Sequence, residues 1–192
     1  DIVAFDTGPG NMIIDGLIER TSGGRKAFDL DGKTAARGTV DKGLLREMLK
    51  HPFFGRRPPK STGREEFGRQ YCDVLYRKAV GRSIPAKDLI ATTTAFTAES
   101  IARAYRRFLP VMPDEVILCG GGARNKTLVQ MLRERLAATE ILLSDDLGIS
   151  SDAKEAVSFA ILAHATIKGV ANNVPAATGA DQSLVLGKIV PA

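Results

Sequence analysis

Short apolar runs alternate with longer stretches of helical spacing along most of the chain. Three apolar runs predict strands, at residues 2–5, 115–119 and 140–143. Helical spacing predicts helices that begin near residue 14 and at 42–50, 86–108, 126–138 and 152–168, the last rich in alanines that allow close packing. This alternation predicts an α/β layer architecture with a mostly parallel sheet. The terminal run at 184–190 is either a last strand or a tail.

Local signals place the ends of several elements. Asn11 is a plausible N-cap of the first helix, and Gly23 and Gly24 are a plausible stop. Residues 25–43 read as a loop with a short helix near 34–37. Residues 53–62 should be extended, because their two adjacent prolines disfavour the helical basin. The chain opens inside the first predicted strand without a Met, so we expect it to be part of a longer protein with further strands upstream.

The charge balance narrows the class of partner. The chain has 27 Lys and Arg against 22 Asp and Glu, a formal net charge of +5, and the surplus is thickest between Arg46 and Arg82. A nucleic-acid interface would usually add aromatic platforms for stacking, but Trp is absent and Tyr occurs three times. A solvated basic surface or a phosphate-bearing small molecule is therefore favoured over nucleic acid. No stretch approaches the roughly 18 apolar residues of a membrane span, so no membrane partner is expected.

Cysteine and histidine usage argues against zinc sites and against serine- and zinc-hydrolase chemistry. Cys72 and Cys119 have no C-x-x-C partner, which indicates neither a zinc site nor a disulfide and fits a reducing, cytoplasmic compartment. His51 precedes a proline and His164 lies in the alanine-rich helical run, so structural roles are favoured for both. There is no G-x-S-x-G or H-E-x-x-H motif. We therefore expect carboxylates to perform any acid–base chemistry.

The hexapeptide at 6–11 is the most informative segment. Asp6 ends a predicted strand, and Thr7, Gly8, Gly10 and Asn11 lead into the first helix. An acid at the carboxyl end of a strand points into the crevice where open α/β sheets bind ligands. The glycines allow close backbone approach, and the helix offers free N–H groups to an anion. A tight turn whose acid accepts bonds from its own loop is the structural alternative, and both remain open.

A second glycine turn repeats this layout. Gly120, Gly121 and Gly122 follow a predicted strand, with Asn125 just before the next helix. Consecutive glycines leave the backbone bare for a flat purine or a phosphate. The spacing to Lys126 does not match a P-loop, and a plain glycine connector is the alternative. Two such turns at two strand ends favour a nucleotide cleft.

A polar segment between the two turns has two compatible interpretations. Its residues are Lys60, Ser61, Thr62, Gly63, Arg64 and Glu65. Their Lys, Arg and hydroxyl groups could hold phosphate or sugar hydroxyls. Thr62 and Glu65 also have the T-x-x-E spacing of a capping box, which the spacing alone favours.

An acidic group near residue 150 also has two interpretations. Asp145, Asp146 and Asp152 could position magnesium, usually through water. Asp152 is equally a good N-cap, with Glu155 as its partner at the Asp-x-x-Glu spacing. The cap is favoured, and the sequence assigns no metal ligand.

Five strings together resemble the carboxyl-terminal part of the anhydro-N-acetylmuramic acid kinase family, in the superfamily of sugar kinases, heat-shock chaperones and actin. They are FDTGPGNMIID at 5–15, PPKSTGREEF at 58–67, CGGGARN at 119–125, DAKEA at 152–156, and NNVPAATGA with LGKI at 172–180 and 186–189. They occur in family order, and PKSTGRE with DTGPGN is highly specific. The resemblance implies a ribonuclease H-like, actin-like ATPase fold. Residues 1–192 would form one carboxyl-terminal nucleotide-binding lobe, truncated at its amino-terminal strands.

The resemblance also implies a function. Such a kinase uses ATP and Mg²⁺ to open the ring of 1,6-anhydro-N-acetylmuramic acid with water and phosphorylate O6, in cytoplasmic recycling of cell-wall sugar. Asp6 would be the general base. Substrate contacts would come from Thr7, Gly8, Gly10, Asn11 and Glu155, and nucleotide contacts from Gly120, Gly121, Gly122 and Asn125. The resemblance gives no individual roles to residues 60–65.

The implied partners follow from the same resemblance. They are ATP, the anhydro-amino sugar and an amino-terminal lobe that this chain lacks, and a homodimer is a further candidate. Because phosphoryl transfer uses groups from both sides of the cleft, we expect the chain alone to be inactive. A nucleotide-binding module without sugar chemistry, as in actin and the chaperones, is the alternative.

Overall fold

The computed structural model describes residues 2–151 and 153–190 of the chain. Its α-helices are α1 (Met12–Thr21), α2 (Lys42–Met48), α3 (Arg64–Phe67), α4 (Arg69–Gly81), α5 (Ala86–Phe108), α6 (Lys126–Arg135), α7 (Lys154–Ile167) and α8 (Pro175–Thr178). The strands are β1 (Glu115–Leu118) and β2 (Glu140–Leu143). Short 3-10 turns lie at Leu30–Gly32, Ala35–Arg37, Pro52–Gly55, Gly121–Arg124 and Ser144–Leu147.

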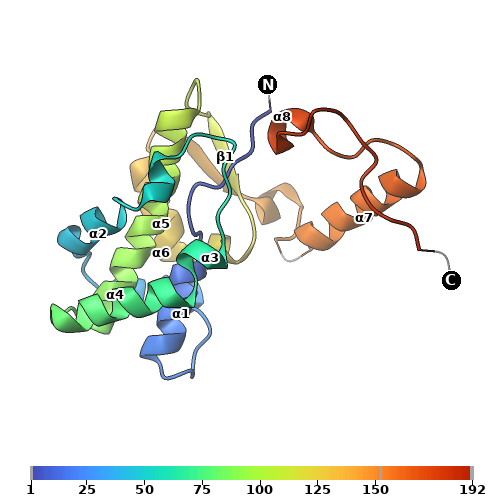
Figure 1. Cartoon of the computed structure of the whole chain (residues 1–192). Helices are drawn as coiled ribbons and strands as arrows, with labels where there is room; N and C mark the ends of the chain where they lie inside the picture. The colour runs from blue at the N-terminus through green and yellow to red at the C-terminus, as the bar shows by residue number, and fades with distance from the viewer. Residues whose placement is uncertain (1, 152, 191–192) are drawn as a thin grey trace.

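Helix α5 is the axis of the main body, and α1, α2, α4 and α6 pack around it (Figure 1). Its first half carries Leu89, Ile90 and Phe96 into a core shared with α1 and α4. Its second half carries Ala98 and Ala102 into a separate core shared with α6 and the strands. The small alanine side chains let α6, which follows the second predicted glycine turn, approach α5 closely.

The sheet is parallel but small. β1 and β2 pair in parallel from Glu115 with Glu140 to Leu118 with Leu143, and α6 connects them. This confirms the predicted α/β class. The predicted strand at 2–5 is wrong for the described structure, because a strand needs a neighbour for its hydrogen-bond ladder and no described strand lies beside it. The run at 184–190 likewise forms no strand and continues as a tail.

The structure has only some of the predicted helix ends and caps. Gly23 and Gly24 both have positive φ values, 64° and 79°, and end α1 as predicted. Asn11 occupies the N-cap position, but its side chain makes no capping bond. The capping box at Thr62 is wrong, since Gly63 precedes α3 and no side chain caps that helix. The short helix near 34–37 is confirmed as a 3-10 turn.

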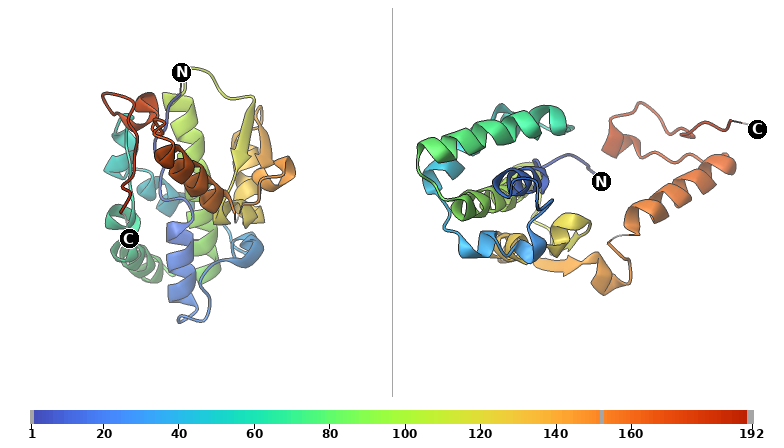
Figure 2. Two further views of the ribbon diagram at one scale, coloured as in Figure 1. Left: turned by 90° about the vertical axis from the view of Figure 1, so that its right-hand side faces the viewer. Right: turned by 90° about the horizontal axis from the view of Figure 1, so that it is seen from below.

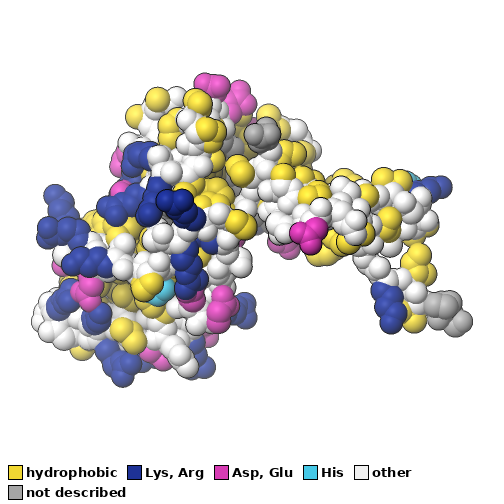
Figure 3. All heavy atoms as spheres, turned by 45° about the horizontal axis from the view of Figure 1, so that its top comes forward, with side chains coloured by type: hydrophobic (Ala, Val, Ile, Leu, Met, Phe, Trp, Pro, Cys, Tyr) yellow, Lys and Arg dark blue, Asp and Glu magenta, His cyan; other side chains and the backbone are white. Residues whose placement is uncertain are grey.

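The carboxyl-terminal part, α7 onward, projects from the main body (Figure 2). No residue of α7 is buried, so the expected close packing of its alanines does not occur in the described structure. Hydrophobic side chains lie exposed along this projection (Figure 3), among them Val157, Phe159, Ile161 and Ile167. The tail folds back on α7 through Asn172, whose amide donates to the carbonyl of Leu162 at 2.9 Å and whose Oδ1 accepts a bond of 2.6 Å from the backbone N–H of Leu186.

Within the described residues, no helix combines the length and the apolar character that crossing a membrane requires.

Candidate functional site

The turn that precedes α1 packs against the middle of α5. A Cβ at Gly8 would come 2.7 Å from Oγ of Ser100, so any larger residue would force a shift there. Gly10 has a φ of 58°, which favours glycine, and its carbonyl accepts a 2.6 Å hydrogen bond from the hydroxyl of Thr97. Thr97 is buried, so this bond holds the turn against the core. Packing and turn geometry therefore account for both glycines, whatever ligand they meet.

Asp6 is exposed and anchored to the predicted polar segment. Its backbone N–H donates to the carbonyl of Lys60 at 2.9 Å, and its Oδ2 accepts from the backbone N–H of Thr62 at 2.8 Å. Its second carboxylate oxygen makes no hydrogen bond with the described residues and can accept one from a water or a hydroxyl. The hydroxyl of Thr62 donates to Glu66 at 2.6 Å rather than to Glu65. The fold thus joins two motifs that lie 56 positions apart.

Asn11 is tied to an acid that sequence reasoning missed. Its amide donates to Oδ2 of Asp15 at 2.6 Å, one turn further along α1. Burial raises the pKa of Asp15 from 3.8 to about 6, the Asn11 bond opposes that shift, and the nearby Asp29 carboxylate adds to it. Asp29 is buried and accepts bonds from the backbone of residues 34 and 35. The i, i+4 spacing of Asn11 and Asp15 was the available signal.

The second glycine turn faces the first. A Cβ on Gly121 would lie 3.8 Å from the amide nitrogen of Asn11. Gly120 has a φ of 77°, and a Cβ there would meet nothing within 4 Å. The bare, open backbone suits the approach of a flat group or a phosphate. The two glycine turns therefore lie next to each other, as predicted.

Asn125 has a structural role that the prediction did not give it. It is buried, and its Oδ1 accepts a 2.9 Å bond from the backbone N–H of Leu128. It is thus the N-cap of α6 and fixes where that helix begins behind the glycine turn.

The described acids of this loop, Asp145 and Asp146, are hydrogen-bonded to neighbouring residues. Asp145 accepts hydrogen bonds from Ser151, which lower the pKa of its carboxyl. Asp146 accepts a 3.2 Å bond from the backbone N–H of Leu143. No group of three or more His, Cys, Asp or Glu among the described residues could hold a metal ion. Asp152, expected as an N-cap, lies outside the described residues.

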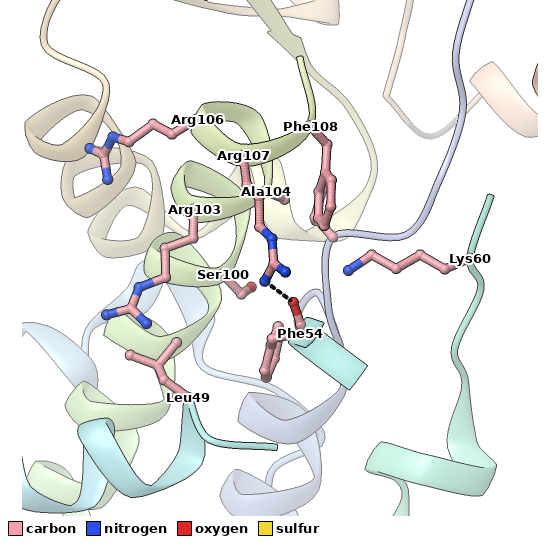
Figure 4. Close-up of a pocket in the computed structure, with 10 residues that line it drawn as sticks. Leu49, Phe54, Lys60, Ser100, Arg103, Ala104, Arg106, Arg107 and Phe108 are labelled. Carbon is pink, nitrogen blue, oxygen red and sulfur yellow. Dashed lines mark hydrogen bonds between the residues drawn. The ribbon is translucent and has the colours of Figure 1, made fainter. Parts of the chain in front are cut away.

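Glu155 is not brought to the other predicted residues. It is exposed on the projecting α7 and makes no hydrogen bond or ion pair with the described residues. Thr7, in contrast, stays beside Asp6 and lines a pocket of about 320 Å³ at the end of α5 (Figure 4). The structure therefore groups Asp6, Thr7 and the two glycine turns on the main body and leaves Glu155 apart.

His51 packs among aromatic rings, as a structural role predicts, and His164 is exposed on α7. His51 lies in an aromatic cluster with Phe54, Phe67 and Tyr71, and burial lowers its pKa. Both cysteines are free, and Cys72 is buried, which raises its pKa to about 11. Cys119 is exposed and directly precedes Gly120 of the second glycine turn.

Comparison with known proteins agrees with the motifs. A family model described as anhydro-N-acetylmuramic acid kinase matches residues 1–192. A protein of that name from Caldanaerobacter subterraneus subsp. tengcongensis is 51% identical over 98% of this chain and 48% of its own length. Relatives of the same name from a Cyanothece species and from Clostridioides difficile are 45% and 42% identical, over 98% and 100% of this chain. The chain spans about half the length of the curated relatives it matches.

Proposed function

The chain belongs to the anhydro-N-acetylmuramic acid kinase family, and from that premise we propose that it forms the nucleotide-binding lobe of an ATP-dependent kinase for this sugar. In the proposed reaction, water attacks the anomeric carbon of the 1,6-anhydro ring and the bond from that carbon to O6 breaks. O6 takes the γ-phosphoryl group of ATP, which leaves ADP and the 6-phosphate of N-acetylmuramic acid.

The placement of Asp6 carries this proposal. The backbone N–H of Asp6 donates to the carbonyl of Lys60, and the backbone N–H of Thr62 donates to the Asp6 carboxylate, while the side chain stays exposed. Its second oxygen can therefore accept the proton of an attacking water without a change of rotamer. A general base positioned in this way typically contributes about 10²–10⁴-fold to the rate. Thr7, Gly8 and Gly10 would then form the wall of the sugar site.

The glycine turn at 120–122 is the proposed nucleotide contact. Its backbone is open at Gly120, and Asn11 lies across from Gly121. Asn125 would act here by fixing the start of α6 rather than by offering its oxygen, which the helix already uses. Mg²⁺ bound to ATP would neutralise charge on the transferring phosphoryl group, held mainly through phosphate oxygens and water.

The rest of the site would come from the region of the relatives' sequences that this chain does not cover. The exposed apolar side chains of α7, such as Phe159 and Ile161, are the surface that we propose packs against it. Glu155 lies on the same helix, so this packing would decide whether it reaches the sugar.

The sugar dependence of ATP turnover tests this function. The intact protein should convert ATP to ADP only when the anhydro sugar is present, and reaction in ¹⁸O-water should place the label on the anomeric carbon. ATP hydrolysis that is indifferent to the sugar would instead support a nucleotide-binding module of the actin and chaperone type.

A further inference from the structure

A basic pocket lies beside the candidate site, between the last turns of α5 and the segment that precedes α3. Its volume is about 320 Å³, and Thr7 forms part of its wall. Four cationic side chains line it, and no acidic side chain among the described residues does: Lys60, Arg103, Arg106 and Arg107. Lys and Arg side chains gather on this main body of the molecule (Figure 3).

Two of the four cations already have partners outside the pocket. Arg103 forms a 2.8 Å ion pair with Glu99 on the same helix. Arg106 donates a hydrogen bond to the carbonyl of Arg135. Figure 4 shows both guanidinium groups directed away from Lys60. Neither charge is therefore directed at the interior of the pocket.

The other two cations converge on one aromatic ring. The Lys60 ammonium lies 4.8 Å from the centre of the Phe108 ring, and the Arg107 guanidinium carbon lies 5.2 Å from it. Arg107 donates to the carbonyl of Phe54 at 3.0 Å, and Lys60 to that of Phe53 at 3.4 Å. All of these partners are neutral, so no anionic group among the described residues compensates the two charges.

The electrostatics of Lys60 are consistent with this geometry. Burial lowers its pKa, and the positive charges of Arg107 and Arg56 lower it further. Arg56 is itself paired with Glu66, so Lys60 and Arg107 form the uncompensated pair. Like charges held together in a partly desolvated pocket are stabilised when an anion binds between them.

We propose that the pocket between Lys60 and Arg107 binds a small organic oxyanion, a carboxylate or a phosphate monoester. The two cations would hold the oxyanion through charge-assisted hydrogen bonds. The rings of Phe54 and Phe108 would contact its apolar body, and the volume suits a ligand of a few heavy atoms beyond the charged group. Because Thr7 follows the proposed base, the bound group would lie next to the sugar site and apart from the glycine turn at 120–122.

Binding of two simple probes tests this site without ATP or the anhydro sugar. Inorganic phosphate and D-lactate are titrated separately into the protein at constant ionic strength, with amide chemical shifts as the readout. At least one probe should saturate. Lys60→Gln and Arg107→Gln should each weaken it by about tenfold or more, and Arg107→Lys by less, because each cation supplies a charged hydrogen bond.

Lys87→Gln is the matched control. It removes the same charge from an exposed position at the far end of α5, and binding should not change. Thermal unfolding of each variant separates loss of the site from loss of the fold. Saturation by phosphate alone identifies a phosphate site, and saturation by lactate identifies a carboxylate site. The proposal is overturned if neither probe saturates, or if both Gln variants bind as the wild type does. The result is independent of kinase activity.

Discussion

The half-buried carboxylate of Asp15 should make stability depend on pH in a specific way. Burial raises its pKa to about 6 from an ordinary value of 3.8. Asp15→Asn keeps an oxygen that can accept the Asn11 amide and removes the charge. The folded state binds the Asp15 proton more tightly than the unfolded state does. The protonated carboxyl therefore adds to the free energy of unfolding below about pH 4, and this stabilisation is lost as the pH rises through 6.

The magnitude follows from the size of the shift. A shift of about 2 pKa units at about 1.4 kcal/mol each corresponds to at most about 3 kcal/mol, and partial solvent access reduces it to about 1–2 kcal/mol. The variant should therefore gain about that much free energy of unfolding, relative to wild type, between pH 4 and pH 7.5. The difference should begin to open near pH 4 and level off above pH 6.

Urea unfolding followed by far-ultraviolet circular dichroism measures this difference at several pH values, since the chain has no Trp. Asp181→Asn is the control, because Asp181 is exposed and makes no hydrogen bond with the described residues. Its difference from wild type should be smaller and lack the rise toward pH 6. A flat difference for Asp15→Asn, within about 0.5 kcal/mol, would refute the view that this carboxylate is strained by burial.

Two substitutions test how the first glycine turn is held on α5. Gly8→Ala should destabilise the fold by about 1–3 kcal/mol, because its Cβ would lie 2.7 Å from Oγ of Ser100, whereas Gly55→Ala has open space and should cost less. Equal losses from the two in thermal or urea unfolding would contradict the close contact. Thr97→Val removes the hydroxyl that donates to the carbonyl of Gly10 and should cost about 0.5–1.5 kcal/mol. Thr94→Val removes only a bond to its own helix and should cost less, and the reverse order would argue against the anchoring role.

The sequence predicted the elements that local periodicity determines. The parallel pair β1 and β2 and the 23-residue α5 follow directly from apolar runs and helical spacing. The strand predicted at 2–5 failed because strand formation depends on a neighbour, which no local pattern reveals. The same limit explains α7, whose alanines were expected to allow close packing but which has no buried residue in the described structure.

In the candidate site, too, features that depend on local sequence were predicted and contacts between distant segments were not. The two glycine turns were predicted as neighbours, because both follow apolar runs, and Gly121 and Asn11 do face each other. The contact of Asp6 with Thr62 depends on the path of the whole segment between them and could not be read from spacing. The convergence of Lys60 and Arg107 was equally invisible, since it needs the end of α5 to meet a loop 47 positions earlier in the chain.

The most direct test of the proposed function is the turnover of the intact protein with Asp6→Asn. The substitution keeps the shape of the side chain and an acceptor for the Thr62 N–H, but removes the base. Sugar-dependent formation of ADP should fall by about 10²–10⁴-fold while ATP binding stays unchanged, because the glycine turn at 120–122 is not altered. Turnover within about tenfold of the wild-type rate would contradict the assignment of Asp6 as the general base.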